Sequence, residues 1–250
     1  MTDQLSPRII ARRIRAELQR LADPAAARQA KTFFKEEVRL HGVTAPMMRQ
    51  VAKALYVEIK PHWRYADALT LCRLVLPRKM LEEIAVALII CGRYAKEFSP
   101  ELLGDLHDWI DRGWLASWGE IDCLCGEVLG PLLLRYPDLA TDTRKWTASP
   151  NRWLRRAAAV GLVKPARRGQ MLDAAYDTAS RLKSDPEDLV QKATGWLLRE
   201  AGRTDRKRLE EFLLIHGRKI ARTTLRYAIE HFPPAEYKRL LEETKPGRTP

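Results

Sequence analysis

The sequence has little that would build a β-sheet. Long alternations of β-branched residues are missing, and glycine contributes only 13 of 250 residues. The commonest residues are Leu, Ala, Arg and Glu, which favour helices. An apolar fraction of 46% is enough for a substantial core. The composition therefore predicts an all-α protein of one large or two modest domains.

Cysteine is scarce, and its spacing does not suggest a metal. The four cysteines do not form a C-x-x-C pair with a second pair or with suitably spaced histidines, which argues against a zinc site. Each lies in an apolar, helix-like context and is interpreted as a small core residue. They are Cys72, Cys91, Cys123 and Cys125.

Signals for export or membrane attachment are missing as well. The first 18 residues are charged throughout, unlike a signal peptide, and no lipidation motif is found. The longest apolar run, near residues 84–91, is too short to span a bilayer. We expect a cytoplasmic, nucleoid-associated protein of bacterial type, without a membrane partner.

Familiar catalytic motifs are also missing. There is no G-x-S-x-G elbow, Walker loop, dinucleotide fingerprint or H-E-x-x-H sequence. The five histidines are scattered, so each is interpreted as a surface or capping residue. They are His41, His62, His107, His216 and His231. A nucleophilic triad, a metal ligand set and an organic cofactor site are therefore all disfavoured.

Positive charge is what the sequence has in excess. The formal net charge is +12 and the pI is near 9.7. A compact domain with this excess of positive charge usually binds a polyanion, and nucleic acid is the first candidate. An anionic membrane is an alternative, but no basic helix carries a continuous bulky apolar face. A basic surface without a specific partner is the other alternative.

Capping residues and prolines divide the chain into a long series of helices. We expect one domain over residues 1–244 and a flexible tail over 245–250. The predicted helices cover residues 7–21, 25–40, 45–60, 65–74, 78–95, 100–111, 121–136, 139–147, 152–163, 169–182, 186–201, 206–215, 221–231 and 234–244.

The segment WLASWGEID, residues 114–122, combines aromatic rings with a carboxylate. Trp118 and Asp122 are four residues apart and would share one helix face. A carboxylate beside an indole face attracts positive charge, directly and through the ring quadrupole. The alternative interpretation makes Trp118 a core aromatic and Asp122 a helix cap.

The C-terminal half contains a weak internal repeat. NRWLRRAAAVGLV around Arg156 resembles DLVQKATGWLLRE around Lys192, and both resemble TLRYAIEHF around Arg226. The basic residues recur every 34 to 36 positions, which indicates an α-solenoid of helix pairs with a basic concave face. A non-repetitive helical bundle is the alternative. Trp196 follows Lys192 by four residues on the same helix face, a pairing suited to a phosphate and its sugar.

These segments resemble the AlkD family of DNA glycosylases, which excise alkylated purines. The resemblance rests on WGEID (118–122), WTASPNRWLRRAA (146–158), VQKATGWLLRE (190–200) and HGVTAP (41–46). It implies HEAT-like antiparallel helix pairs with a concave basic face. By this resemblance the catalytic set is Asp122, Trp118 and Trp196, and the DNA-binding set is Arg156, Lys192, Phe33, Arg155 and Arg226.

The sequence departs from the family pattern at two places, in the second helix and within the segment WGEID. Phe33 stands where the family has a tyrosine in the second helix. Gly119 and Glu120 stand where a second aspartate and a small residue are usual.

The resemblance implies a monofunctional glycosylase for base excision repair. It would hydrolyse the N-glycosidic bond of N3- or N7-alkylpurines such as 3-methyladenine or 7-methylguanine in duplex DNA, and it would permit bulky adducts. The family acts without base flipping, metal or cofactor, and we expect a monomer. The alternative is a non-catalytic HEAT-repeat protein that binds distorted or branched DNA. A protein-binding solenoid fits the fold but not the charge.

Overall fold

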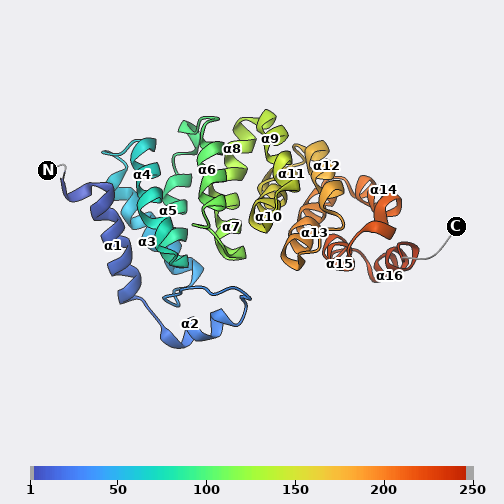
Figure 1. Ribbon diagram of the computed structural model, residues 1–250, viewed down its shortest axis with the longest axis horizontal. Helices are drawn as coiled ribbons and strands as arrows, with labels where there is room; N and C mark the ends of the chain where they lie inside the picture. Colours follow the sequence, from blue (N-terminus) through green and yellow to red (C-terminus); the bar gives the residue numbers. More distant parts are fainter. Residues whose placement is uncertain (1–2, 246–250) are drawn as a thin grey trace. The chain divides into compact units, whose positions relative to one another are not determined.

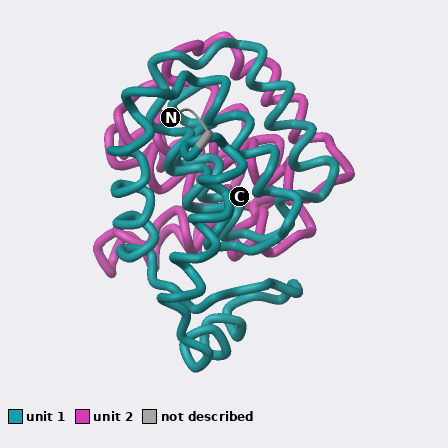
Figure 2. Tube along the Cα trace, turned by 90° about the vertical axis from the view of Figure 1, so that its left-hand side faces the viewer, with its two compact units in different colours: residues 1–132 teal, residues 133–250 magenta. Residues whose placement is uncertain are grey.

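The computed structural model describes residues 3–245, and within them the chain is all-α, as predicted. No β-strand occurs in this range, where the Arg39–Met80 pairing is an isolated bridge. None of the described helices is long and apolar enough to cross a membrane. The chain divides into two compact units, one up to Leu132 and one from Leu133 onward (Figure 2). The expected single domain is not tested by this division, and of the expected tail only Lys245 lies in the described range.

The helices follow one another with mostly short connections, apart from the irregular stretch over residues 32–44 (Figure 1). Unit 1 contains α1 (Pro7–Arg20), α2 (Pro24–Lys31), α3 (Ala45–Ile59), α4 (Tyr65–Val75), α5 (Leu81–Gly92), α6 (Leu102–Asp111), α7 (Trp118–Leu124) and a π-helical turn (Cys125–Leu129). Helix α8 (Gly130–Arg135) carries the chain into unit 2. Unit 2 contains α9 (Ala140–Lys145), α10 (Arg152–Gly161), α11 (Val163–Arg167), α12 (Leu172–Leu182), α13 (Asp188–Gly202), α14 (Arg206–His216), α15 (Arg222–Ala228) and α16 (Pro234–Glu243).

Unit 1 is built around α5. This helix is apolar on all sides, and its residues from Glu82 to Cys91 are buried. A helix without a polar face must be enclosed, and α1, α3, α4 and α7 pack around it. Helix α1 has a single apolar stripe, made by Ile10, Ile14 and Leu18, because it covers the core from one side only.

Unit 2 arranges its helices in two rows. Helices α10, α13 and α15 pack against one another in that order, and α12 and α14 pack against α13 (Figure 1). The first three helices are the three related segments of the sequence repeat. Arg156, Lys192 and Arg226 therefore come one from each neighbouring helix of the same row.

The second predicted helix is wrong in its C-terminal half. It was expected over residues 25–40, but α2 ends at Lys31 and the chain continues in irregular backbone. The buried carboxylate of Glu82 accepts hydrogen bonds from the backbone N–H groups of His41, Gly42 and Val43, at 3.0, 2.8 and 3.3 Å. These bonds hold the backbone directly after the predicted helix, and within it the Arg39 carbonyl accepts from the Leu81 N–H at 3.1 Å. Tertiary bonds thus take the place of helical ones at the C-terminal end of the segment.

The helix predicted over residues 121–136 is also different. It begins at Trp118, because Ser117 and Glu120 form a capping box: the Ser117 hydroxyl accepts from the Glu120 N–H, and Glu120 accepts from the Ser117 N–H at 3.0 Å. The helix then widens into the π-helical turn after Leu124. The sequence S-W-G-E already contained the capping signal, and the prediction missed it.

Candidate functional site

Trp118 and Asp122 lie one turn apart on α7 and therefore share one face of the helix, as expected from their spacing in the sequence. Both side chains are half-buried. The helix that carries them is fixed at its start by Glu120, whose carboxylate accepts from the backbone N–H groups of Ala116 and Ser117 at 2.8 and 3.0 Å. Burial raises the pKa of Glu120, and these hydrogen bonds oppose the rise. Glu120, one of the departures from the family pattern, is thus a capping residue.

The indole of Trp118 is held by the segment after α2. The Phe34 ring stacks on it with the ring centroids 4.8 Å apart and the planes 13° from parallel. The indole Nε1 donates to the Phe33 carbonyl at 3.3 Å. Gly119 lies against the same ring, since a Cβ there would lie 3.3 Å from Leu81 Cδ1 and 3.5 Å from the Phe34 ring.

Phe33 itself points away from the protein and is 71% exposed. The sequence analysis placed an aromatic at this position in a helix, whereas the structure places it in the turn after α2. Phe34, which the sequence analysis did not single out, is the ring that contacts Trp118. The sequence shows two adjacent aromatic residues at this place, but only the path of the backbone decides which of the two side chains turns inward.

Asp122 lies in a region of negative charge. Burial raises the pKa of the neighbouring Cys123 thiol to about 12, and the charges of Glu127 and Asp122 add to the rise. The charge of Arg49, from α3, acts in the opposite direction. Cys123 therefore stays protonated near neutral pH and is not a thiolate nucleophile. A developing cation would be stabilised beside these carboxylates.

In unit 2, Arg156 and Lys192 lie close together. Arg156 is only 5% exposed, and its Nη1 donates to the Leu189 carbonyl in the first turn of α13. Lys192 Nζ pairs with Asp188 at 2.9 Å. The hydrogen bond to Asp188 raises the pKa of Lys192, and the nearby charge of Arg156 opposes the rise. Lys192 is therefore a permanent cation at neutral pH.

Trp196 continues the face of α13 that carries Lys192. It is half-buried, and its indole Nε1 is enclosed with no hydrogen-bond partner among residues 3–245. The neighbouring Gly195 is buried against α15, where Tyr227 is half-exposed and Arg226 is exposed. Tyr227 was missed by the sequence analysis; its position beside Arg226 in the third repeat was the available signal.

Arg155, like Arg156, directs its donors to partners within the protein. Its Nε donates to Asp185 at 2.7 Å and its Nη2 to the same carboxylate at 3.3 Å. Its Nη1 donates to the carbonyls of Ser149 and Pro150 at 2.9 and 3.1 Å. Four donors used in this way fix the turns before α10 and α13.

Within the described range, no group of three or more His, Cys, Asp or Glu side chains could hold a metal ion. The predicted site residues are divided between the units. Phe33, Trp118 and Asp122 belong to unit 1, and Arg155, Arg156, Lys192, Trp196 and Arg226 belong to unit 2.

The family model described as DNA alkylation repair enzyme matches residues 14–232, which is most of the chain. The chain belongs to the DNA alkylation repair enzyme family. This confirms the resemblance found in the sequence at the level of the family. Among solved structures, the chain is similar to a predicted DNA alkylation repair enzyme from Enterococcus faecalis, with a TM-score of 0.74 and 18% identity over 85% of this chain and 97% of that one. No curated protein matches the chain.

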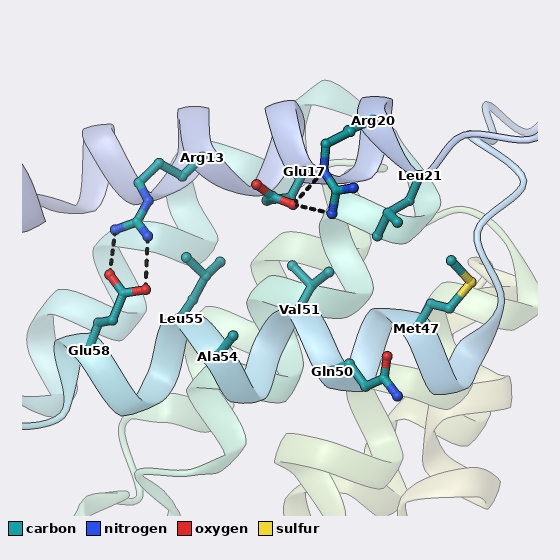
Figure 3. A pocket seen from close by; sticks show the side chains of 10 residues that line it. All are labelled: Arg13, Glu17, Arg20, Leu21, Met47, Gln50, Val51, Ala54, Leu55 and Glu58. Atoms are coloured by element: carbon teal, nitrogen blue, oxygen red, sulfur yellow. Dashed lines mark hydrogen bonds and ion pairs between the residues drawn. The ribbon is translucent and has the colours of Figure 1, made fainter.

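This member of the DNA alkylation repair enzyme family also has a groove between α1 and α3 that contains none of the predicted residues (Figure 3). Its volume is about 410 Å³, and its floor includes Val51, Ala54 and Leu55. Arg13 pairs with Glu58 across the two helices at 2.8 Å. The groove carries mixed charge over an apolar floor, unlike the aromatic and acidic surface of α7.

Proposed function

We propose that this protein is a DNA glycosylase that hydrolyses the N-glycosidic bond of cationic N3- or N7-alkylated purines in duplex DNA, without base flipping, for base excision repair. The observation that carries the proposal is the half-buried pair of Trp118 and Asp122 on α7, with its indole held by Phe34 and Phe33. Membership of the DNA alkylation repair enzyme family supports a DNA lesion as the substrate.

The reaction suits a carboxylate without a general acid. An alkylated purine is already cationic and leaves as a neutral base when its bond to the sugar breaks. Positive charge then develops on the deoxyribose, as in glycoside hydrolysis. Asp122 would stabilise this charge and orient the attacking water, whose proton Asp122 or bulk solvent would accept.

The two tryptophans would stabilise the same charge through their ring faces. An indole face attracts a cation by about 0.5–2 kcal/mol, depending on how far both are removed from water. Trp118 offers a face that is already oriented. Trp196 would lay its ring against a deoxyribose, in line with its place beside Lys192 on α13.

DNA binding would rest on the cations of unit 2. Lys192 and Arg226 reach the surface and would meet backbone phosphates directly. Arg156 is buried, so its charge would act from beneath the same surface. Phe33 is the exposed aromatic of unit 1 and would contact the DNA beside Trp118.

Release of free base from methylated duplex DNA tests the proposal. Wild type should release 7-methylguanine or 3-methyladenine, and Asp122→Asn should lower the rate about 100- to 1,000-fold while DNA affinity stays within a few-fold. Asp111→Asn, an exposed aspartate at the end of α6, is the matched control and should keep full activity. Absence of release from methylated and bulky-adduct DNA, together with salt-sensitive binding, would instead support a non-catalytic DNA-binding protein.

A further inference from the structure

The contact between Phe34 and Trp118 constrains the indole more than ordinary packing does. The stack, with centroids 4.8 Å apart and planes 13° from parallel, fixes the ring plane. The hydrogen bond from the indole Nε1 to the Phe33 carbonyl, at 3.3 Å, fixes the rotation of the ring within that plane. Two adjacent residues therefore hold the indole in both respects.

The segment that carries Phe33 and Phe34 is itself anchored to α5. The buried carboxylate of Glu82 binds three consecutive backbone N–H groups of residues 41–43. The Leu81 N–H donates to the Arg39 carbonyl at 3.1 Å. These bonds connect the C-terminal end of the segment, residues 39–43, to the most buried helix of unit 1.

An indole has two faces, and Phe34 covers one of them. No second aromatic ring stacks on Trp118 within residues 3–245. A sugar cation can therefore approach only the face opposite Phe34. We infer that Phe34 is a positioning residue: it turns the opposite face of the Trp118 indole toward the deoxyribose, and it acts on the reaction through Trp118 alone. This inference rests on the proposed glycosylase function.

A set of three substitutions separates positioning from packing. Phe34→Tyr keeps the flat ring and should keep kcat within about twofold. Phe34→Leu keeps much of the apolar volume but no flat ring, and it should lower kcat about 10- to 100-fold with KM within about twofold. Phe212→Leu, which removes an aromatic contact with Tyr176 in unit 2, is the matched control and should leave kcat unchanged. Equal activity of Phe34→Leu and Phe34→Tyr would overturn the inference.

A double-mutant cycle tests whether Phe34 acts through Trp118. In a Trp118→Ala background, Phe34→Leu should cause no further loss of kcat, because no indole remains to be oriented. Losses that multiply would show that Phe34 acts independently and would overturn the inference.

The geometry can be measured without the reaction. In the ¹H–¹⁵N spectrum of the indole groups, the signal lost in Trp118→Phe identifies Trp118. That signal should shift in Phe34→Leu, because the ring current of Phe34 is gone, and should stay nearly in place in Phe212→Leu. A shift in a protein that releases no base would overturn the proposed function but leave the stack in place. An unmoved signal would overturn the positioning role even in an active glycosylase.

Discussion

Gly195 and Tyr227 bring α13 and α15 into close contact. A Cβ on Gly195 would lie 2.4 Å from Tyr227 Cβ and 2.6 Å from the Thr224 carbonyl oxygen. The contact lies between Lys192 and Trp196 along α13, so it fixes the spacing of the surface on which the cations and the indole are displayed.

Gly195→Ala should therefore destabilise the protein although alanine is the better helix former. The methyl group meets a backbone carbonyl that cannot move alone, and overpacking of this kind costs about 1–3 kcal/mol. DNA affinity should fall as well, because α13 and α15 must separate. Denaturant unfolding and DNA titration measure the two effects.

Gly104→Ala is the matched control for Gly195→Ala. A Cβ at Gly104, in α6, meets nothing within 4 Å, and replacing a helical glycine by alanine there should stabilise by about 0.5–1 kcal/mol. If Gly195→Ala behaves like Gly104→Ala, the two helices are not in the close contact described.

Because Lys192 and Asp188 form an ion pair, we expect substitutions of the two residues to change DNA affinity in opposite directions. Lys192→Ala should weaken binding and reduce the slope of log affinity against log salt by about one, because one phosphate contact is lost. Asp188→Asn removes a negative charge 2.9 Å from the ammonium and should tighten binding about 3- to 10-fold at low salt.

Lys207 on α14 provides the comparison for Lys192. Its side chain is 88% exposed and also faces an acidic residue one turn away, Glu211. Lys207→Ala should leave the salt slope unchanged because α14 packs outside the row that carries Lys192. An equal reduction by both substitutions would mean that the charge effect is general rather than local.

We expect Trp196→Phe to leave the stability of the protein nearly unchanged. Its indole N–H is buried without an acceptor in the described range. Burying this unpaired donor costs free energy of folding, and a phenylalanine at the same position would avoid that cost. Trp196→Phe should leave the free energy of unfolding unchanged within about 1 kcal/mol, since the lost ring area and the removed donor offset each other. Base release should fall severalfold, because phenylalanine attracts cations less than tryptophan does.

Trp63→Phe is the control for Trp196→Phe, because the indole N–H of Trp63 does have a hydrogen-bond acceptor. Its Nε1 donates to the Leu5 carbonyl at 2.8 Å, and the side chain is buried. This substitution loses both ring area and a hydrogen bond and should destabilise by about 1–3 kcal/mol. Equal costs at the two positions would contradict the assignment of an orphan donor to Trp196.

Much of the fold follows from local signals in the sequence. Helix periodicity and proline positions predicted α1, α3 and α14 to within a residue or two of the observed bounds. The repeat of Arg156, Lys192 and Arg226 predicted three helices of one kind, which do form one row in unit 2. Periodicity suffices here because each helix buries one continuous face.

The failures arise where tertiary contacts outweigh local preference. No local pattern indicates that Glu82 will bind residues 41–43 or that the Arg39 carbonyl will accept from the Leu81 N–H, although both contacts hold the irregular segment that follows Lys31. Phe34 could not be distinguished from Phe33 for the same reason. Nor does the local sequence indicate that the donors of Arg155 are directed to Asp185 and the carbonyls of Ser149 and Pro150, or that Arg156 donates to the Leu189 carbonyl.

The capping box of α7 predicts a pH dependence of stability at Glu120. Burial raises the pKa of this carboxyl above its unfolded value. The stabilisation linked to its neutral form is therefore complete below the unfolded pKa and is lost as pH rises through the folded one. At neutral pH the ionised carboxylate carries a desolvation cost that glutamine would not.

Glu120→Gln should consequently be at least as stable as wild type at pH 7, because the amide oxygen can still accept from the Ala116 and Ser117 N–H groups. The difference should shrink as pH falls into the acidic range where the wild-type carboxyl is protonated. Glu120→Ala removes the acceptor itself and should cost about 1 kcal/mol or more, with a larger cost at acidic pH, where the wild-type carboxyl is neutral, than at pH 7. Unfolding measured across this range distinguishes the two variants, and a Glu120→Gln protein that is less stable at pH 7 would show that the charge, rather than the acceptor, holds the start of α7.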